Sequence, residues 1–146
     1  MLKMKKYLFT LIVLVMSTLS AETKLQNREL PVEELKTQNK TIAKMASLEI
    51  AKSLPQKIDK FTTLVSVQAK EATIVYTHEL DIASKSDETI KKEDHSRMEK
   101  AIAKGSCISS KRFLDADIAL RYVYISKKTK AELFQFYIDK KSCSSL

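Results

Sequence analysis

Two cysteines and two histidines have the widest chemical range among the 146 residues of this sequence. Cys107 and Cys143 could form a disulfide, or they could bind zinc together with His78 and His95. Zinc sites usually take two ligands from one short segment, as in C-x-x-C or H-x-x-x-H, and the sequence contains neither pair. We therefore predict a Cys107–Cys143 disulfide and no metal site, and the four-ligand zinc site is the alternative.

The scarcity of histidine also restricts catalysis. A triad or an acid–base scheme would have to use His78, on the apolar face of a predicted strand, or His95, on a solvated face of a predicted helix. Glu79 and Asp81 share a strand face, a spacing that could suit glycosidase chemistry, but most such pairs are solvated charge. One glycine cannot build a phosphate-binding loop. The sequence predicts no catalytic and no cofactor-binding residues.

The first residues have the pattern of a secretory signal peptide. Residues 1–6 carry three lysines and no acidic residue, and residues 7–21 carry no charge. The apolar core, residues 7–16, is shorter than the ~20 residues that a spanning helix needs, and small residues follow it up to Ala21. We predict that residues 1–21 are removed by cleavage, with an uncleaved N-terminal anchor as the alternative. Export to an oxidising compartment would also favour the disulfide.

The charge pattern argues against nucleic acid as a partner. The full chain has 26 Lys and Arg against 18 Asp and Glu, and loss of the three lysines in residues 1–21 would lower the net charge from +8 to +5. Acidic and basic residues are interleaved, as in residues 85–94, whereas a nucleic-acid binder would concentrate basic residues on one face. The charge therefore indicates a solubilising surface.

The rest of the chain predicts a polar, flexible leader over residues 22–30 and a single α+β domain over residues 31–146. From Pro31 to Leu54 apolar residues recur at helical spacing, and Pro55 ends the run. A second, more solvated helix is expected from Ser86 as N-cap to Gly105 as C-terminal cap. The domain should therefore contain two helices.

Alternating apolar residues predict four strands, at residues 61–69, 74–80, 118–126 and 132–139. A short turn at residues 109–114 precedes the third strand. We expect an αββαββ order, with two hairpins in one four-stranded antiparallel sheet and the long helix on one face. Both faces of the 118–126 strand are largely apolar, which is typical of a strand covered on two sides. Either the second helix or a partner should therefore cover the other face.

Val123 and Ile125 lie on the odd-numbered face of the third strand and are the candidate partner surface. Core packing is the alternative role for both residues, because a buried strand and a docking strand share the same apolar composition. The sequence favours core packing over partner docking for each of them.

Several short motifs resemble those of known exported domains. They are Leu54-Pro55-x-x-Ile58-Asp59, Thr62-Thr63-Leu64-Val65-Ser66-Val67, Ile74-x-Tyr76, Cys107, Arg112-x-Leu114, Leu120-Arg121-Tyr122-Val123-Tyr124, Leu133-Phe134-x-Phe136 and Cys143. The pattern resembles small exported αββαββ domains, which include the β-class type II secretion pilotins and the related family of quorum-sensing-regulated virulence factors. Pilotins of this class are lipoproteins that bind the C-terminal helix of an outer-membrane secretin subunit and escort it outward. This sequence departs from them because no cysteine stands near the predicted cleavage site, so the resemblance implies binding without the lipoprotein route.

The leading functional hypothesis is a non-enzymatic periplasmic or secreted accessory protein. It would dock a segment of an envelope or secretion-system partner, such as a secretin-like protein, by helix-in-groove packing or by strand addition to a sheet edge. The alternative is a cell-wall enzyme, or an inhibitor of one, that acts through surface loops. A concave pocket with converging titratable side chains would favour an enzyme. We expect no cofactor and no transmembrane span in the mature protein, and the oligomeric state stays open.

Overall fold

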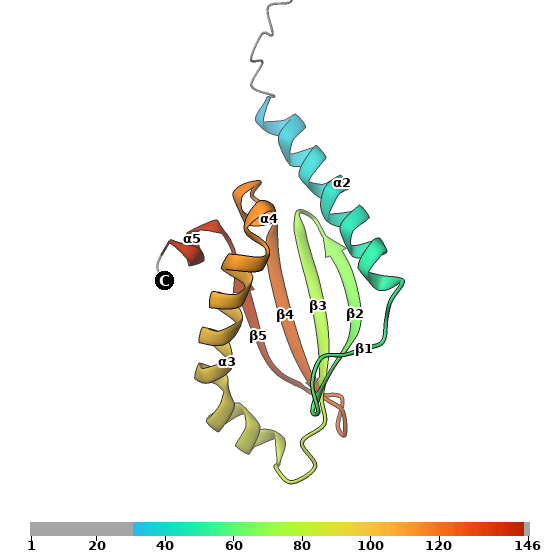
Figure 1. Cartoon of the computed structure of the whole chain (residues 1–146), viewed down its shortest axis with the longest axis vertical. Helices are drawn as coiled ribbons and strands as arrows, with labels where there is room; N and C mark the ends of the chain where they lie inside the picture. Colours follow the sequence, from blue (N-terminus) through green and yellow to red (C-terminus); the bar gives the residue numbers. More distant parts are fainter. Residues whose placement is uncertain (1–30, 145–146) are drawn as a thin grey trace, which may run out of the picture.

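The computed structural model describes residues 31–144, and the predicted signal peptide and leader lie outside the described residues. The first half contains α2 (Val32–Ala51), β1 (Gln56–Lys57), β2 (Thr62–Lys70) and β3 (Thr73–Leu80). The second half contains α3 (Asp87–Ser109), α4 (Lys111–Asp115), β4 (Ala119–Ser126), β5 (Glu132–Ile138) and α5 (Lys140–Cys143). Figure 1 shows one twisted sheet, with α2 beside β2 and α3 beside β5. Within the described range, no helix is both long and apolar enough to cross a membrane.

The sheet differs from the predicted one in two respects. It has five strands, in the order β1-β2-β3-β4-β5, and it is mixed, because β3 and β4 are parallel while the other neighbours are antiparallel. The prediction of a four-stranded antiparallel sheet is therefore wrong. Along the chain, α3 follows β3 and precedes β4, and it runs back along the sheet. β4 therefore starts at the same end of the sheet as β3, and the two strands are parallel. β1 has only two residues, too few to show an alternating pattern.

α2 forms where the helical spacing predicts it. Glu33 and Glu34 lie in its first turn, where the helix dipole favours negative charge. Its buried residues are Ala43 and Ser47, one turn apart, and the Ser47 hydroxyl donates a hydrogen bond to the Ala43 carbonyl at 2.8 Å. Because both side chains are small, the helix backbone can lie close to the sheet.

α3 begins at the predicted cap, where the Thr89 N–H donates to the Ser86 hydroxyl at 3.3 Å. The prediction that α3 ends at Gly105 is wrong, because the helix continues to Ser109. Gly105 has no positive φ, so it is an ordinary helical residue and not a left-handed cap. One residue further on, the Ser106 hydroxyl donates to the Tyr122 hydroxyl at 2.9 Å. This partly buried contact joins the additional turn of α3 to the sheet.

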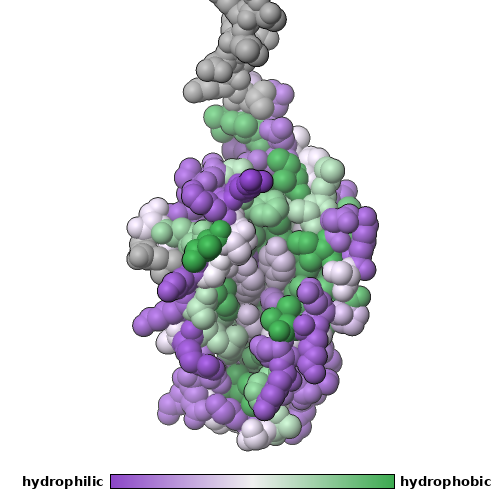
Figure 2. All heavy atoms as spheres, in the orientation of Figure 1, coloured by the Kyte–Doolittle hydropathy of each residue, from purple (hydrophilic) through white to green (hydrophobic). Residues whose placement is uncertain are grey.

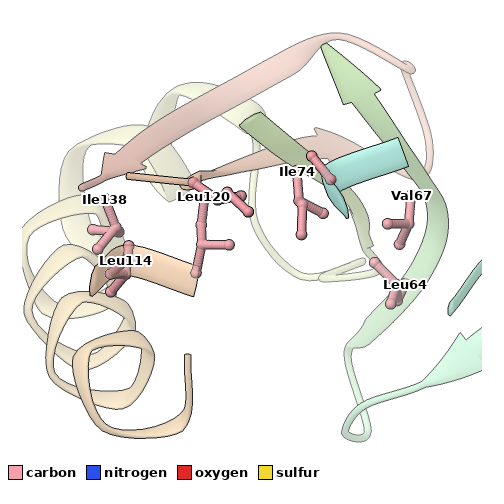
Figure 3. Packing of buried hydrophobic residues seen from close by; sticks show 8 residues of the cluster. Leu64, Val67, Ile74, Leu114, Leu120 and Ile138 are labelled. Carbon is pink, nitrogen blue, oxygen red and sulfur yellow. The ribbon is translucent and has the colours of Figure 1, made fainter. Parts of the chain in front are cut away.

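The hydrophobic core lies on one face of the sheet, beneath both long helices. Figure 3 shows its side chains projecting from neighbouring strands to the same side. Ala43 of α2 and Ile102 of α3 pack on this cluster, so the second helix shares a face with the first and does not cover the other one. The fully or nearly fully buried members are Ala43, Leu64, Val67, Ile74, Leu114, Ile118, Leu120 and Ile138. A second cluster continues along the same face towards the start of α3 and contains Leu80, Ile90, Tyr124, Leu133, Phe134 and Phe136.

The structure contains the predicted disulfide. Cys107, near the end of α3, is bonded to Cys143 at the end of α5, with 5.6 Å between the Cα atoms. Neither thiolate is then free to bind zinc, which removes the four-ligand alternative. A bridge over a sequence separation of 36 residues stabilises a fold by about 4 kcal/mol when it restricts the unfolded chain. The bridge fastens α3 to α5, which follows β5.

Candidate functional site

His78 is a packing residue on the helix-covered face. Only 7% of its surface is exposed, and its ring is stacked on that of Tyr124 with 4.8 Å between centroids. Burial lowers the pKa of His78 to about 4, and the nearby Asp59 carboxylate opposes this only in part. His78 is therefore neutral near pH 7. Its Nδ1 has no hydrogen-bond partner among the described residues.

The other residues considered for catalysis have structural partners. The ring of His95, on α3, lies 5.1 Å from that of Phe136, so this half-exposed residue packs on β5 as well as facing solvent, which corrects the predicted solvated position. Glu79 forms an ion pair with Lys130. Asp81 forms one with Lys127 at 2.8 Å. The two carboxylates are thus held by lysines of the β4–β5 turn.

The most distinctive surface feature is a groove between α2 and α3. Figure 2 shows a hollow between these two helices, with hydrophobic residues on its sides. The rings of Tyr76 and Tyr122, on β3 and β4, stack with 5.2 Å between centroids and are partly exposed on the sheet face below. Burial raises the pKa of Tyr76 to about 12, so its hydroxyl is uncharged at neutral pH. The floor of the groove is therefore aromatic and uncharged.

One side of α3 forms the first wall of the groove. Met98 and Ala101 line a cavity of about 540 Å³ between α3 and the start of β2. Gly105 and Ile108 follow Ala101 by four and seven residues, so they continue the same side of the helix. A β-carbon on Gly105 would meet nothing within 4 Å, and Ile108 is 74% exposed. This wall is apolar and has open space in front of its backbone.

The facing side of α2 forms the second wall. The Asn39 side chain donates a hydrogen bond to the Ala116 carbonyl at 2.6 Å, which shows that this side of α2 is turned towards α4 and β4. Leu35 and Ile42 precede and follow Asn39 by four and three residues and share its side of the helix. They are 41% and 38% exposed, although their spacing in the sequence suggested core positions. Large apolar side chains therefore border the groove without being covered.

Charges at the β2 end of the groove neutralise one another. Asp94, on α3, accepts hydrogen bonds from Arg97 at 2.8 Å and from Lys85 at 3.4 Å. Burial by itself would raise the pKa of Asp94, but these two partners hold it below its usual value. Asp94 is thus an ionised, paired carboxylate and not a general acid. The site offers packing and hydrogen bonds to a ligand instead of acid–base chemistry.

Sequence reasoning missed the groove for an identifiable reason. Its α3 wall combines Ala101, Gly105 and Ile108, and the glycine was interpreted as the end of the helix. The spacing of four between Ala101 and Gly105 within a helix was the available signal, because small residues at this spacing let another backbone approach. That signal depends on the helix continuing past Gly105, where the Ser106 hydroxyl contacts Tyr122, far away in the sequence.

The predicted partner surface lies on the opposite face of the sheet. Val123 and Ile125 are both partly buried there, and no helix of the described chain packs over them. The register sets Val123 between Thr77 and Gln135, so its neighbours on both adjacent strands are polar. This face is less apolar than the groove.

The comparisons with known proteins agree with this architecture. A family model described as a domain of unknown function, DUF8479, matches residues 37–134. The chain belongs to this family. No curated protein sequence matches the chain.

Three solved structures share the fold of this DUF8479 member at 12–15% sequence identity. The secreted protein PA3611 of Pseudomonas aeruginosa matches with a TM-score of 0.66 and 12% identity, over 75% of this chain and 96% of that chain. The type 2 secretion pilotin EpsS of Vibrio vulnificus matches with a TM-score of 0.62 and 12% identity, over 76% of this chain and 96% of that chain. The type II secretion pilotin AspS of Vibrio cholerae matches with a TM-score of 0.61 and 15% identity, over 76% of this chain and 97% of that chain. The resemblance to pilotin-like domains is thereby confirmed at the level of the fold.

Proposed function

We propose that this protein is a non-enzymatic accessory protein of the bacterial envelope that docks an apolar helix of a partner in the groove between α2 and α3. The observation that carries the proposal is the pair of facing apolar walls above an aromatic floor. By helical spacing, Ile42 borders it on α2 and Ile108 on α3, where they are 38% and 74% exposed, and Ala101 lines the cavity beside α3. An amphipathic helix buries its apolar face in a groove of this kind.

The fold of the pilotins suggests which helix that would be. EpsS and AspS are pilotins of type II secretion systems, and they share this architecture. By this likeness, the partner segment is the C-terminal helix of a secretin subunit, and the protein works in the periplasm after loss of residues 1–21. The alternative of a cell-wall enzyme is less well supported, because His78 is buried and the carboxylates Glu79, Asp81 and Asp94 are ion-paired. An inhibitor acting through surface loops would leave the groove unused.

Gly105 allows a direct test of the groove. Gly105 is exposed and a β-carbon there would meet no other atom within 4 Å, so a tryptophan would project into the groove. Gly105→Trp should therefore leave the fold intact and reduce binding of the partner helix at least tenfold. Binding is measured by calorimetry with a synthetic peptide of the secretin C-terminal segment from the same genome. Lys104→Trp is the matched control, because Lys104 lies on the side of α3 that points away from the sheet, and it should bind normally.

Two outcomes would contradict the proposal. The first is normal binding of the peptide to a folded Gly105→Trp variant. The second is no binding of the peptide to the unchanged protein. Gly105→Ala adds a stability control, since alanine in a helix interior is favoured over glycine by about 1 kcal/mol and should raise the melting temperature without altering binding.

A second docking surface, at Val123 and Ile125, stays a proposal of lower rank. Both residues lie on the uncovered face, which supports access, but their neighbours Thr77 and Gln135 make this surface more polar than the groove. Lysine substitutions at these two positions distinguish the two surfaces.

A further inference from the structure

The outer edge of β2 is covered over only part of its length. β1 pairs with it at two positions, Gln56 with Leu64 and Lys57 with Thr63. Pro55 precedes β1 and has no N–H, so it cannot extend the ladder. From Ser66 to Lys70 no described strand pairs with this edge. A strand edge of five residues is therefore open within the described structure.

The backbone groups of Val67 and Ala69 point towards the open edge. Along a strand the side-chain face and the direction of N–H and C=O both alternate with a period of two, so residues on one face present these groups to one edge. Thr62 shows which edge this is, because its carbonyl accepts a hydrogen bond from Ile58, on the β1 side, at 2.9 Å.

The register places Val67 and Ala69 on the same face as Thr62. In the register of β2 with β3, Val67 lies opposite Tyr76, Ala69 opposite Ile74, and Thr62 opposite Leu80. Tyr76, Ile74 and Leu80 all face the helices. The bulge between Leu64 and Ser66 accounts for the change from even to odd numbers. Val67 and Ala69 therefore offer two donors and two acceptors to an incoming strand.

A cavity of about 390 Å³ runs beside this edge, on the side of α2 that faces away from the groove. Its lining includes Leu48, which is 59% exposed, together with Val67 and Ala69 of the strand. Alternate side chains of an added strand would enter this cavity.

The charges around the cavity select the occupant. Lys40 and Lys44 line it, and Lys40 is paired with Glu71 at 2.5 Å. Lys44 has no ion pair with any described residue. A second copy joined edge to edge would bring two sets of these lysines together, which is repulsive. A carboxylate on the incoming strand would instead pair with Lys44.

We propose that the edge of β2 from Ser66 to Lys70 is a second docking site, which takes up an extended, acidic segment of a partner protein by strand addition. The site does not depend on the proposed groove, since it lies on the other side of α2. Main-chain hydrogen bonds from Val67 and Ala69 would provide affinity, and Lys44 would select an acidic side chain.

The probe is an eight-residue peptide, acetylated and amidated, in which valine alternates with aspartate and threonine. In the matched control peptide, lysine replaces aspartate. Added to the full chain, the aspartate peptide should slow amide hydrogen exchange of Val67 and Ala69 at least tenfold, as measured by NMR. The lysine peptide should leave both exchange rates unchanged.

Ala69→Pro tests the hydrogen bonds directly. The N–H of Ala69 points to the open edge, so proline removes a donor for the incoming strand without breaking the ladder to β3. Ala69→Pro should abolish peptide binding, while Ala69→Ser, which keeps the N–H, should bind normally. Lys44→Glu should weaken binding at least fivefold, and Lys100→Glu on α3, which makes the same change of charge elsewhere, should not.

Three results would overturn the proposal. One is exchange of Val67 and Ala69 that does not respond to millimolar aspartate peptide. Another is normal binding to a folded Ala69→Pro variant. The third is slower amide exchange of these two residues at higher protein concentration without peptide, which would mean that a second copy of the chain binds this edge. Gly105→Trp separates this proposal from the groove, because it should leave the β2 edge fully active.

Discussion

In the described part of the chain, helices cover one face of the sheet and leave the other face uncovered, although the same strands form both faces. Ile74, Leu120 and Ile138 lie opposite one another on the helix side and are at most 3% exposed. Their neighbours Arg121 and Tyr137 lie on the other face, where Tyr137 is 52% exposed and the guanidinium of Arg121 lies over its ring. The comparison shows that an apolar residue on a strand does not by itself indicate a covered face. Valine and isoleucine also favour strands where they are only half-buried.

The helix-covered face is itself divided. Its flanks are filled by α2 and α3, which bury Ala43 over β2 and Ile90 near β5. Its middle, at Tyr76 and Tyr122, stays partly exposed between them. The tyrosine side chains suit this position because they combine an apolar ring with a hydroxyl that can meet water or a ligand. The groove is therefore an unfilled part of the core face.

The largest expected effect is a difference in stability between substitutions at two adjacent residues of β3 that lie on opposite faces of the sheet. Ile74→Ala removes a side chain with no exposed surface and should lower the free energy of unfolding by about 2–5 kcal/mol. Val75→Ala, one residue further on and on the opposite face, should cost less than about 1 kcal/mol. Urea unfolding monitored by circular dichroism gives both values. Equal losses at the two positions would mean that the opposite face is also covered.

A pH-dependent loss of stability should arise from His78. Its pKa is about 4 in the folded protein and about 6.5 in the unfolded chain, so the unfolded chain binds the proton more readily. Stability should therefore be constant above about pH 6.5, fall as the pH decreases towards 4, and change no further from this group below 4. The full loss is about 3 kcal/mol. Unfolding free energies between pH 7 and 4 measure it.

His78→Phe should remove most of this slope, and His95→Gln, at a half-exposed position, should keep it. An unchanged slope in His78→Phe would show that the imidazole is not responsible. The double variant of both histidines should still bind its partner near neutral pH, because neither histidine supplies a proton or a metal bond in the proposed function. Loss of binding with an intact fold would favour the enzyme alternative.

The smallest expected effect concerns Val123 and Ile125. Changing either residue to lysine should cost at most about 1 kcal/mol and leave the melting temperature close to normal, because the face is uncovered and a lysine can reach water. Thermal melts and the secretin peptide titration are run on the same variants. A loss of several kcal/mol would show that the face is buried, and loss of peptide binding with normal stability would move the docking site from the groove to this face.

Local patterns predicted the elements of this fold well. The Pro31 to Pro55 interval produced α2, Ser86 marked the start of α3, and the alternation at residues 61–69 and 74–80 produced the first hairpin. These features depend on residues close together in the chain, on caps, proline and periodicity. The position of Gly105 inside α3 was predicted wrongly because the competing contact, from Ser106 to Tyr122, spans 16 residues.

The sequence by itself determined the alternation of helices and strands, the absence of a Gly-rich phosphate loop, and that any intramolecular disulfide must join Cys107 to Cys143. The structure shows that this disulfide forms. Only the tertiary structure decided that β3 and β4 are parallel and that both long helices occupy one face. The physical reason is that periodicity specifies which side of an element is apolar, but not which other element will cover it. The groove exists because α2 and α3 cover the flanks of one face and leave its centre to the solvent.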